Sequence, residues 1–317
     1  MRLCRIEHQG TTAAAFYSED CVTPLAVAAA AYAEVTGTNL DLSNEDHLLA
    51  FLPGGPYSET AITLATWLAE HPESNASSAL ATTDVKLLVP NPKPNKLFLL
   101  AGNYAAHIEE GGGIAAERAE TFPYVFMKPP TTTLTNPGAP VQIPSVSPDS
   151  IDWELELGVI IGQGGKHITE TDALNHVAGY TVINDISDRK FRPNPNRKER
   201  SKDSFFDWLH GKWHDTACPC GPCITSASAI SDPQSLQLKL TLNNEIRQDA
   251  STAQQIFPVA AVIEFISSFV TLEPGDMIST GTPSGVGSTT GTFVKPGDVL
   301  EATISSIGTL HSPLIAE

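Results

Sequence analysis

The sequence predicts an α+β protein in which a sheet-rich core follows a smaller mixed segment. Short apolar runs with the alternation or the β-branched content of strands outnumber helical patterns. Most strand-like runs follow one another without an intervening helix, which disfavours the alternating order of a dinucleotide-binding α/β fold. At 317 residues and 41% hydrophobic content, the chain is long enough to bury a sizeable core.

The first part of the chain is predicted to form a small N-terminal domain. Strand-like patterns cover 2–7 and 13–17, and helical patterns cover 25–35 and 60–70. From 71 to 83 the composition shifts to Pro, Ser, Asn, Ala and Thr, which is typical of a linker. We therefore expect a small α/β domain at 1–85 and a larger domain at 86–317.

The larger domain is predicted to consist mainly of short strands broken by Gly and Pro. Helical patterns interrupt them at 170–176 and 258–270. The predicted strands are 96–101, 124–127, 153–161, 178–186, 236–242, 277–280 and 299–304.

Charge and composition exclude several classes of partner. The chain carries 36 acidic residues against 19 Lys and Arg, and its formal net charge of -17 opposes attraction to nucleic acid or to anionic membranes. No apolar stretch is long enough to span a bilayer, and the first residues lack the pattern of a secretion signal. The five cysteines are odd in number and clustered, unlike a secreted disulfide framework. These features predict a cytoplasmic protein with reduced thiols and no membrane segment.

Two glutamates on the strand predicted at 153–161 are candidates for chemistry. Glu154 and Glu156 lie two residues apart and therefore face the same side, roughly 6.6 Å apart along the strand. Carboxylates on so apolar a strand are costly to bury without a counter-charge, which a divalent cation would supply. Asp185, near the end of the strand predicted at 178–186, would add a third oxygen ligand. The alternative, that the two glutamates form the wet face of an amphipathic strand, stays open because spacing does not show that the strands meet.

Seven segments between residues 90 and 314, taken in order, resemble those of the fumarylacetoacetate hydrolase family. The resemblance implies the family's mixed β-sandwich roll, a homodimer, and Mg²⁺ or Mn²⁺ held by Glu154, Glu156 and Asp185. The segments are Gly-Asn-Tyr-Ala-Ala-His at 102–107, Phe-Met-Lys-Pro at 126–129, Asp-Trp-Glu-Leu-Glu at 152–156, Gly-Tyr-Thr through Asn-Asp at 179–185, Gly-Lys through Asp-Thr-Ala-Cys-Pro at 211–219, Glu-Pro-Gly-Asp through Thr-Gly-Thr-Pro-Ser-Gly-Val-Gly at 273–287, and Lys-Pro-Gly-Asp through Ile-Gly-Thr-Leu at 295–310.

The resemblance also implies roles for individual side chains. His107 and Glu110, three residues apart on one helix face, would form the general base. Lys212 would face the substrate and stabilise a developing enolate or oxyanion. Outside this context, a single histidine is more typical of a solvated surface, and for a single lysine a solvated surface position and a functional one are about equally frequent. The residues implied to contact the substrate are Lys128, Arg189 and Thr282.

The reaction implied by the resemblance is cleavage of a C–C bond by a metal-dependent hydrolase. Its substrate would be a small anionic acylpyruvate or 2,4-diketo acid, and a product would be pyruvate or another 2-oxo acid. The family also contains other reactions that pass through an enolate, so two alternatives stay open. These are an oxaloacetate-type decarboxylase and an isomerase or hydratase of 2-hydroxydienoates.

The tetrapeptide Cys220-Gly221-Pro222-Cys223 matches the active-site motif of thioredoxin, which allows a thiol redox protein as a remote alternative. The surrounding residues do not predict the strand-to-helix turn that lowers the first thiol's pKa in such sites. The motif also overlaps the family segment that ends at residue 219. We therefore expect these thiols to have no redox role.

A basic segment marks a departure from the family pattern. Where the family often has Ser-Ala-Arg-Asp, this chain has Ser187-Asp188-Arg189-Lys190. Seven of the 19 basic residues lie between 189 and 202, with Glu199 as the single acid. The hypothesis is a lid or rim in which Arg192, Arg197 and Arg200 attract an anionic substrate. A solvated or dimer-contact loop is the alternative.

Overall fold

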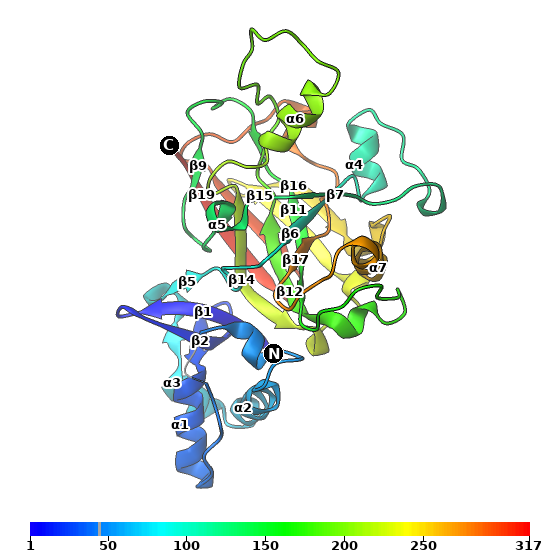
Figure 1. The fold of residues 1–317 in the computed structure, drawn as a ribbon. Coiled ribbons are helices and arrows are strands. Elements are labelled where there is room, and N and C mark those ends of the chain that lie inside the picture. The colour runs from blue at the N-terminus through cyan, green and yellow to red at the C-terminus, as the bar shows by residue number, and fades with distance from the viewer. Residues whose placement is uncertain (44–45) are drawn as a thin grey trace.

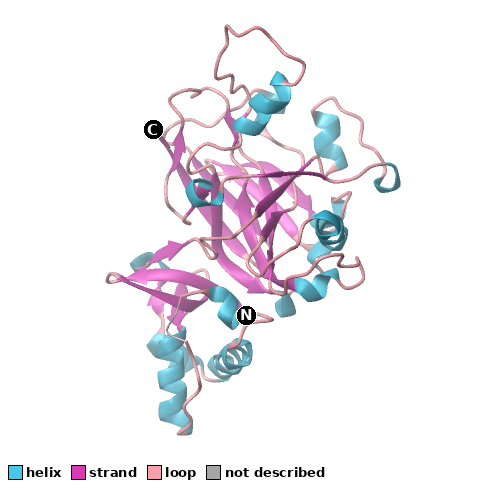
Figure 2. Cartoon of the chain, in the orientation of Figure 1, coloured by secondary structure: helices cyan, strands magenta, loops and turns pink. Residues whose placement is uncertain are grey.

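The computed structural model describes residues 1–43 and 46–317. Strands of two large sheets fill the centre of the molecule, and helices lie around their edges (Figures 1 and 2). The predicted α+β class is confirmed. Within the described residues, no helix is long and apolar enough to cross a lipid bilayer.

The N-terminal elements lie together at the lower end of the molecule in Figure 1, where α1 extends downward from the strands. The strands and helices predicted here are all present. In chain order the elements are β1 (Arg2–His8), β2 (Thr11–Tyr17), β3 (Cys21–Pro24), α1 (Leu25–Thr36), η1 (Leu48–Phe51), α2 (Ser58–Glu70), α3 (Pro72–Ser78), β4 (Leu80–Ala81), η2 (Thr82–Asp84) and β5 (Lys86–Leu88).

The prediction of a linker at 71–83 is wrong. Proline is favourable in the first turn of a helix, and Pro72 begins α3 there. Asn75 then accepts a hydrogen bond from Thr23 Oγ1 over 2.8 Å, and β4 pairs with β3. Polar composition alone did not reveal these tertiary contacts.

The N-terminal strands continue the sheet of the larger part of the chain. Arg2 of β1 pairs with Thr225 of β14, and Arg5 of β1 pairs with Leu88 of β5. The order of the twelve-stranded sheet is β4-β3-β2-β1-β14-β12-β11-β17-β6-β7, with β5 beside β1 and β8 beside β14. The domain boundary at residue 85 stays a prediction.

The remaining strands of this sheet all belong to the larger part of the chain. They are β6 (Leu97–Ala101), β7 (Tyr124–Met127), β8 (Leu134–Thr135), β11 (Leu155–Ile161), β12 (Val177–Asn184), β14 (Cys218–Ser226) and β17 (Met277–Ser279). Every residue of β11, β12 and β14 is buried. At Gly158 of β11, a Cβ atom would lie 2.8 Å from the Ile183 side chain of β12, so glycine permits the close packing of these side chains.

A five-stranded sheet shares an apolar core with the large one. Leu238 and Leu300 from this sheet belong to the same buried cluster as Leu157 and Val182. Its order is β16 (Glu245–Ser251), β15 (Gln237–Leu242), β18 (Val299–Ile304), β19 (Gly308–Ala316) and β9 (Val141–Ile143), and a separate two-stranded sheet joins β10 (Ile151–Asp152) to β13 (Ser187–Asp188).

The helices of the larger part lie at the periphery, with α4 and α6 at the upper end of the sheets in Figure 1. The helix predicted at 258–270 is α7, whereas the pattern at 170–176 forms only the short 3₁₀ helix η4. The α-helices are α4 (Ala105–Glu110), α5 (Pro130–Thr133), α6 (Asp203–His210), α7 (Val259–Phe269) and α8 (Gly287–Thr290), and the 3₁₀ helices are η3 (Arg118–Glu120), η4 (Ala173–His176), η5 (Ala227–Ala229), η6 (Pro233–Ser235) and η7 (Thr252–Gln254).

Candidate active site

Three carboxylates meet where β11 begins and β12 ends. The two strands are antiparallel with Leu155 opposite Asn184, and the Asp185 N–H donates to the Glu154 carbonyl over 2.8 Å. One oxygen each from Glu154, Glu156 and Asp185 lies within 4.8 Å of the others. Glu154 is 5% exposed, and the other two are fully buried. The wet-face alternative for the two glutamates is therefore wrong.

Basic side chains surround this cluster and balance part of its charge. Lys212 Nζ lies 2.6 Å from Glu154 Oε2 and 2.7 Å from Asp185 Oδ2. Lys128 Nζ lies 2.6 Å from Asp185 Oδ1, and an Arg189 terminal nitrogen lies 2.6 Å from Glu154 Oε1. Although burial favours the neutral acid, the charges of Lys212, Arg189 and His107 hold the pKa of Glu154 below its usual value.

Glu156 is the least compensated member of the cluster. Its Oε2 accepts hydrogen bonds from Ser279 Oγ over 2.6 Å and from the Gly281 N–H over 2.8 Å. Its Oε1 is buried and has no hydrogen-bond partner among the described residues. Burial and the charges of Asp185 and Glu154 raise the pKa of Glu156 well above its usual value. An unpaired oxygen beside two further carboxylates fits a hard divalent cation, whose charge would favour the ionised form.

His107 and Glu110 lie on α4 as a hydrogen-bonded pair. His107 Nδ1 is 2.9 Å from Glu110 Oε1, and Glu110 Oε2 accepts the Gly285 N–H over 2.9 Å. The loop that contains Gly285 also supplies the Gly281 N–H that binds Glu156. This loop therefore links the His107–Glu110 pair to the carboxylate cluster through backbone hydrogen bonds.

The residues implied to contact substrate are already bonded to the protein. Arg189 Nε donates to Asp152 Oδ2 over 2.8 Å, and Lys128 Nζ donates to the Ile186 carbonyl over 2.9 Å and to the Ala217 carbonyl. Thr282 Oγ1 donates to the Leu155 carbonyl over 3.0 Å. In the structure these three side chains position the carboxylate cluster, and their contact with substrate stays a prediction.

Sequence reasoning missed two buried residues that support the cluster. Asp152 accepts the N–H groups of Gly287 and Ser288 over 2.6 and 3.0 Å in addition to Arg189 Nε. Gln248 Oε1 accepts the Leu155 N–H over 3.0 Å, and its Nε2 donates to Thr282 Oγ1 over 2.8 Å. Asp152 precedes Glu154 by two positions in the same alternating run, which was a usable signal. Gln248 carried no local signal, since its role depends on a strand almost a hundred residues away.

The cysteines of the thioredoxin-like motif lie in the middle of a sheet. Cys220 and Cys223 belong to β14 and are fully buried, as is Cys218. Burial raises the pKa of Cys218 and of Cys223 to about 12, and raises that of Cys220 further. A reactive dithiol needs an exposed thiol with a lowered pKa, so this environment contradicts the redox alternative.

The four arginines of the basic segment, Arg189 among them, form ion pairs. Arg192 contacts Glu199 over 2.8 Å, and Arg197 Nε contacts Asp203 at the start of α6 over 2.9 Å. Arg197 also pairs with Asp207, and Arg200 pairs with Asp203 over 2.9 Å. From the sequence, we counted Glu199 as the single acid of the segment, because Asp203 and Asp207 of α6 lie just beyond residue 202. Arg189, Lys190 and Arg192 line a cavity of 240 Å³ beside Trp208, and Arg197, Lys198 and Arg200 line another of 340 Å³.

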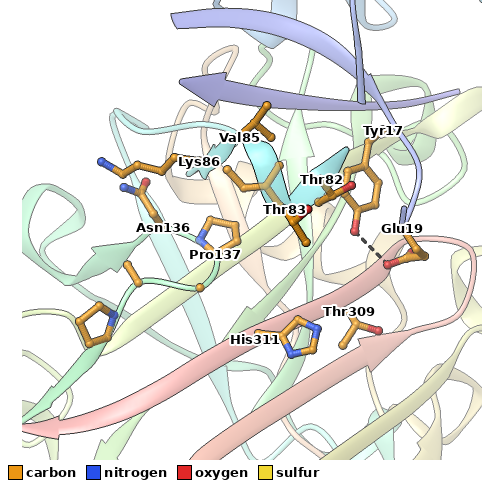
Figure 3. Close-up of a pocket in the computed structure, with 14 residues that line it drawn as sticks. Tyr17, Glu19, Thr82, Thr83, Val85, Lys86, Asn136, Pro137, Thr309 and His311 are labelled. Carbon is orange, nitrogen blue, oxygen red and sulfur yellow. Dashed lines mark hydrogen bonds between the residues drawn. The ribbon is translucent and has the colours of Figure 1, made fainter. Parts of the chain in front are cut away.

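A larger cavity lies away from the carboxylates. It has a volume of 680 Å³ and lies where β2 and the segment around β5 approach β19, with Tyr17 and His311 among its lining residues (Figure 3). Within it, Tyr17 donates a hydrogen bond to Glu19 over 2.9 Å. None of the predicted site residues lines this cavity.

Comparison with known proteins identifies the family of this site. Residues 96–315, more than half of the chain, match the model of the fumarylacetoacetate (FAA) hydrolase C-terminal domain. The chain belongs to the fumarylacetoacetate hydrolase family. Within it, the chain is 38% identical over 264 residues to oxaloacetate tautomerase YisK of Bacillus subtilis (strain 168), an alignment that covers 82% of this chain and 83% of YisK.

Two further relatives illustrate the range of the fumarylacetoacetate hydrolase family. The mitochondrial oxaloacetate tautomerase fahd2 of Xenopus laevis is 37% identical over 239 residues, which cover 74% of this chain and 70% of that protein. The solved structure of maleylpyruvate hydrolase from Sphingobium sp. SYK-6, in complex with manganese (II) ion and pyruvate, has a TM-score of 0.69 and 26% identity, and the match covers 100% of this chain and 99% of that one. The predicted family and its fold are therefore confirmed, and these relatives differ in reaction.

Proposed function

We propose that this protein is a divalent-metal-dependent tautomerase that interconverts the keto and enol forms of oxaloacetate or of a similar small 2-oxo acid. The observation that carries the proposal is the His107–Glu110 pair held beside three buried carboxylates. Such a pair suits proton transfer next to a polarised carbonyl group. Two relatives that are 37% and 38% identical are named oxaloacetate tautomerases, which favours tautomerisation over the C–C hydrolysis predicted first.

Glu154, Glu156 and Asp185 are the residues that would hold the metal ion. A bound Mg²⁺ or Mn²⁺ would polarise the 2-oxo group and offset the charge of the three carboxylates. The unpaired Oε1 of Glu156 supports this assignment, because it offers a buried ligand atom that no protein group uses.

The proton transfer can be assigned to the chain's own side chains. In the keto-to-enol direction, His107 takes a proton from C3 of the substrate and then, as the imidazolium, gives that proton to the C2 oxygen, so that the enol forms and His107 returns to its neutral state. Glu110 accepts from His107 Nδ1, so that Nε2 is left free to act as the base. The Lys212 ammonium group would stabilise negative charge that develops on the C2 oxygen. The reverse steps regenerate the keto acid, and no water is consumed.

C–C hydrolysis is the second candidate, and the maleylpyruvate hydrolase structure favours it. In that reaction His107 would take a proton from water rather than from carbon, and pyruvate would be released. Decarboxylation and isomerisation of a hydroxydienoate would use the same enolate. The two candidates therefore differ in where the proton is taken and in their products.

An assay with fresh enol-oxaloacetate separates these reactions. The loss of enol absorbance is followed with Mg²⁺ and with EDTA, pyruvate is measured by lactate dehydrogenase, and CO₂ release is recorded. Enol loss above the spontaneous rate, without pyruvate or CO₂, supports the tautomerase, and His107→Gln should abolish it while the exposed-site variant His311→Gln should not. Chelator-sensitive release of pyruvate without CO₂ from maleylpyruvate, with no enol loss in the first assay, would instead establish the hydrolase.

A further inference from the structure

Asp188 and His214 form an acid–histidine pair close to Lys212 in the structure. The Asp188 side chain, in β13, is fully buried, and its Oδ2 is 3.1 Å from His214 Nε2. Its Oδ1 accepts hydrogen bonds from Ser150 Oγ over 2.7 Å and from the Lys190 N–H over 3.2 Å. The pair takes no part in the proton transfer proposed above, yet burying a carboxylate is costly unless it is bonded in this way.

Asp188 forms hydrogen bonds to residues on both sides of Lys212 in the sequence. Its N–H donates to the Gly211 carbonyl over 2.9 Å, and its carboxylate binds the His214 ring. A Cβ atom on Gly211 would lie 2.5 Å from the Asp188 carbonyl oxygen, which shows how closely the two backbones approach. Asp188 therefore holds Gly211, the residue before Lys212, through its backbone N–H. It holds His214, the second residue after Lys212, through its side chain.

We propose that Asp188 and His214 are positioning residues that hold Lys212 against Glu154 and Asp185. Lysine has a flexible four-carbon stem, so the position of its ammonium group depends on how firmly its backbone is fixed. Lys212 Nζ contacts both carboxylates at 2.6 and 2.7 Å, and a displacement of about 1 Å at a reacting group can reduce the rate about a hundredfold. The inference rests on the proposed role of Lys212 in stabilising negative charge.

The ionisation state of Asp188 supports this arrangement. Burial favours the neutral acid, but hydrogen bonds from His214, Ser150, Ser147 and the Lys190 N–H hold the pKa of Asp188 below its usual value. The bond to His214 therefore has an ionised acceptor, which makes it stronger than a bond between neutral groups.

The test compares three variants in the enol-oxaloacetate assay. Asp188→Ala, which keeps the N–H to Gly211 but removes the bond to His214, should lower kcat about 10-fold to 100-fold with KM within about 2-fold. Asp188→Asn keeps an acceptor for His214 and should restore most of kcat. Ser150→Ala is the matched control, because it removes a partner of Oδ1 and leaves the His214 bond in place. Equal kcat in Asp188→Ala and Ser150→Ala would overturn the proposal.

A second measurement does not depend on activity. Amide hydrogen–deuterium exchange of the peptide that contains 211–216 should become faster in Asp188→Ala and stay unchanged in Ser150→Ala. If the wild-type protein neither tautomerises oxaloacetate nor cleaves maleylpyruvate, the proposed function fails, whereas faster exchange would still support the attachment of the Lys212 segment. Unchanged exchange in Asp188→Ala, or faster exchange with normal kcat, would refute the positioning role.

Discussion

Glu110 Oε1 lies 2.9 Å from His107 Nδ1, and the other oxygen of Glu110 accepts the N–H of Gly285. One carboxylate thus orients the proposed base and ties α4 to the loop that binds Glu156. The sequence spacing of three residues suggested the first contact only. The second contact couples the position of α4 to the carboxylate cluster, so loss of Glu110 should disturb both.

Glu110→Ala is therefore expected to lower kcat strongly. Without the acceptor at Nδ1, the His107 ring loses its fixed orientation, and a loss of about 10-fold to 100-fold is of the size typical of disturbed acid–base catalysis. Glu109→Ala is the control, because Glu109 is exposed on the same short helix. Steady-state rates for enol-oxaloacetate with Mg²⁺ give the comparison. Similar losses of kcat in the two variants would show that the substitutions act by disturbing α4, and not by removing the bond between Glu110 and His107.

The buried thiols should be inert in the folded protein. Cys4, Cys218, Cys220 and Cys223 are fully buried, whereas Cys21 is partly exposed. Ellman's reagent should therefore titrate no more than one thiol per native chain and all five after denaturation. Cys220→Ser combined with Cys223→Ala should keep its enol-oxaloacetate activity. Rapid titration of two or more thiols in native protein would revive the redox alternative.

Much of the carboxylate cluster could be predicted, because it places charged residues in a strand whose pattern is otherwise apolar. Glu154 and Glu156 introduce charge into an apolar alternating run, and such conflicts between pattern and burial tend to mark functional sites. Asp185 could be added because it ends a second apolar strand. What the sequence could not show is the β11–β12 register that brings the three together.

Other features depend on contacts between distant segments. Gln248 supports Leu155 only because β16 and the β11 region meet in space, and no local pattern signals that meeting. The pairing of β1 with β14, which extends the large sheet into the N-terminal elements, has the same origin. Arg189 could be assigned to the site from its motif, but its bonds to Asp152 and Glu154 depend on side-chain directions that spacing does not specify.

Arg192 is the arginine chosen to test the hypothesis that the basic segment forms a cationic rim, because it lines the cavity beside Trp208. Arg197 is bonded to two acids of α6, so replacing it would disturb that helix and obscure any effect on substrate. Arg192→Gln should raise KM for oxaloacetate about threefold to tenfold and leave kcat unchanged, since a charge outside the reacting centre acts on capture of the anion. The effect should shrink at high ionic strength. Lys198→Gln, an exposed charge of the same segment, is the control, and equal KM values in the two variants would refute the rim.

Metal binding provides a test of the carboxylate cluster that is independent of the reaction. Calorimetric titration with Mn²⁺ should show one site per chain, and Glu156→Gln should weaken it at least tenfold, because the amide removes the unpaired buried oxygen that has no protein partner. At about 100 times the wild-type Kd, Mn²⁺ should stabilise the wild type by about 2.7 kcal/mol and raise its Tm, but should stabilise Glu156→Gln by no more than about 1.4 kcal/mol, with a correspondingly smaller rise in Tm. Asp276→Asn is the matched control: Asp276 is a fully buried carboxylate paired with Lys96 outside the cluster, so this variant should lose stability yet bind Mn²⁺ normally. Wild-type affinity in Glu156→Gln, or equal loss in both variants, would remove Glu156 from the proposed ligands.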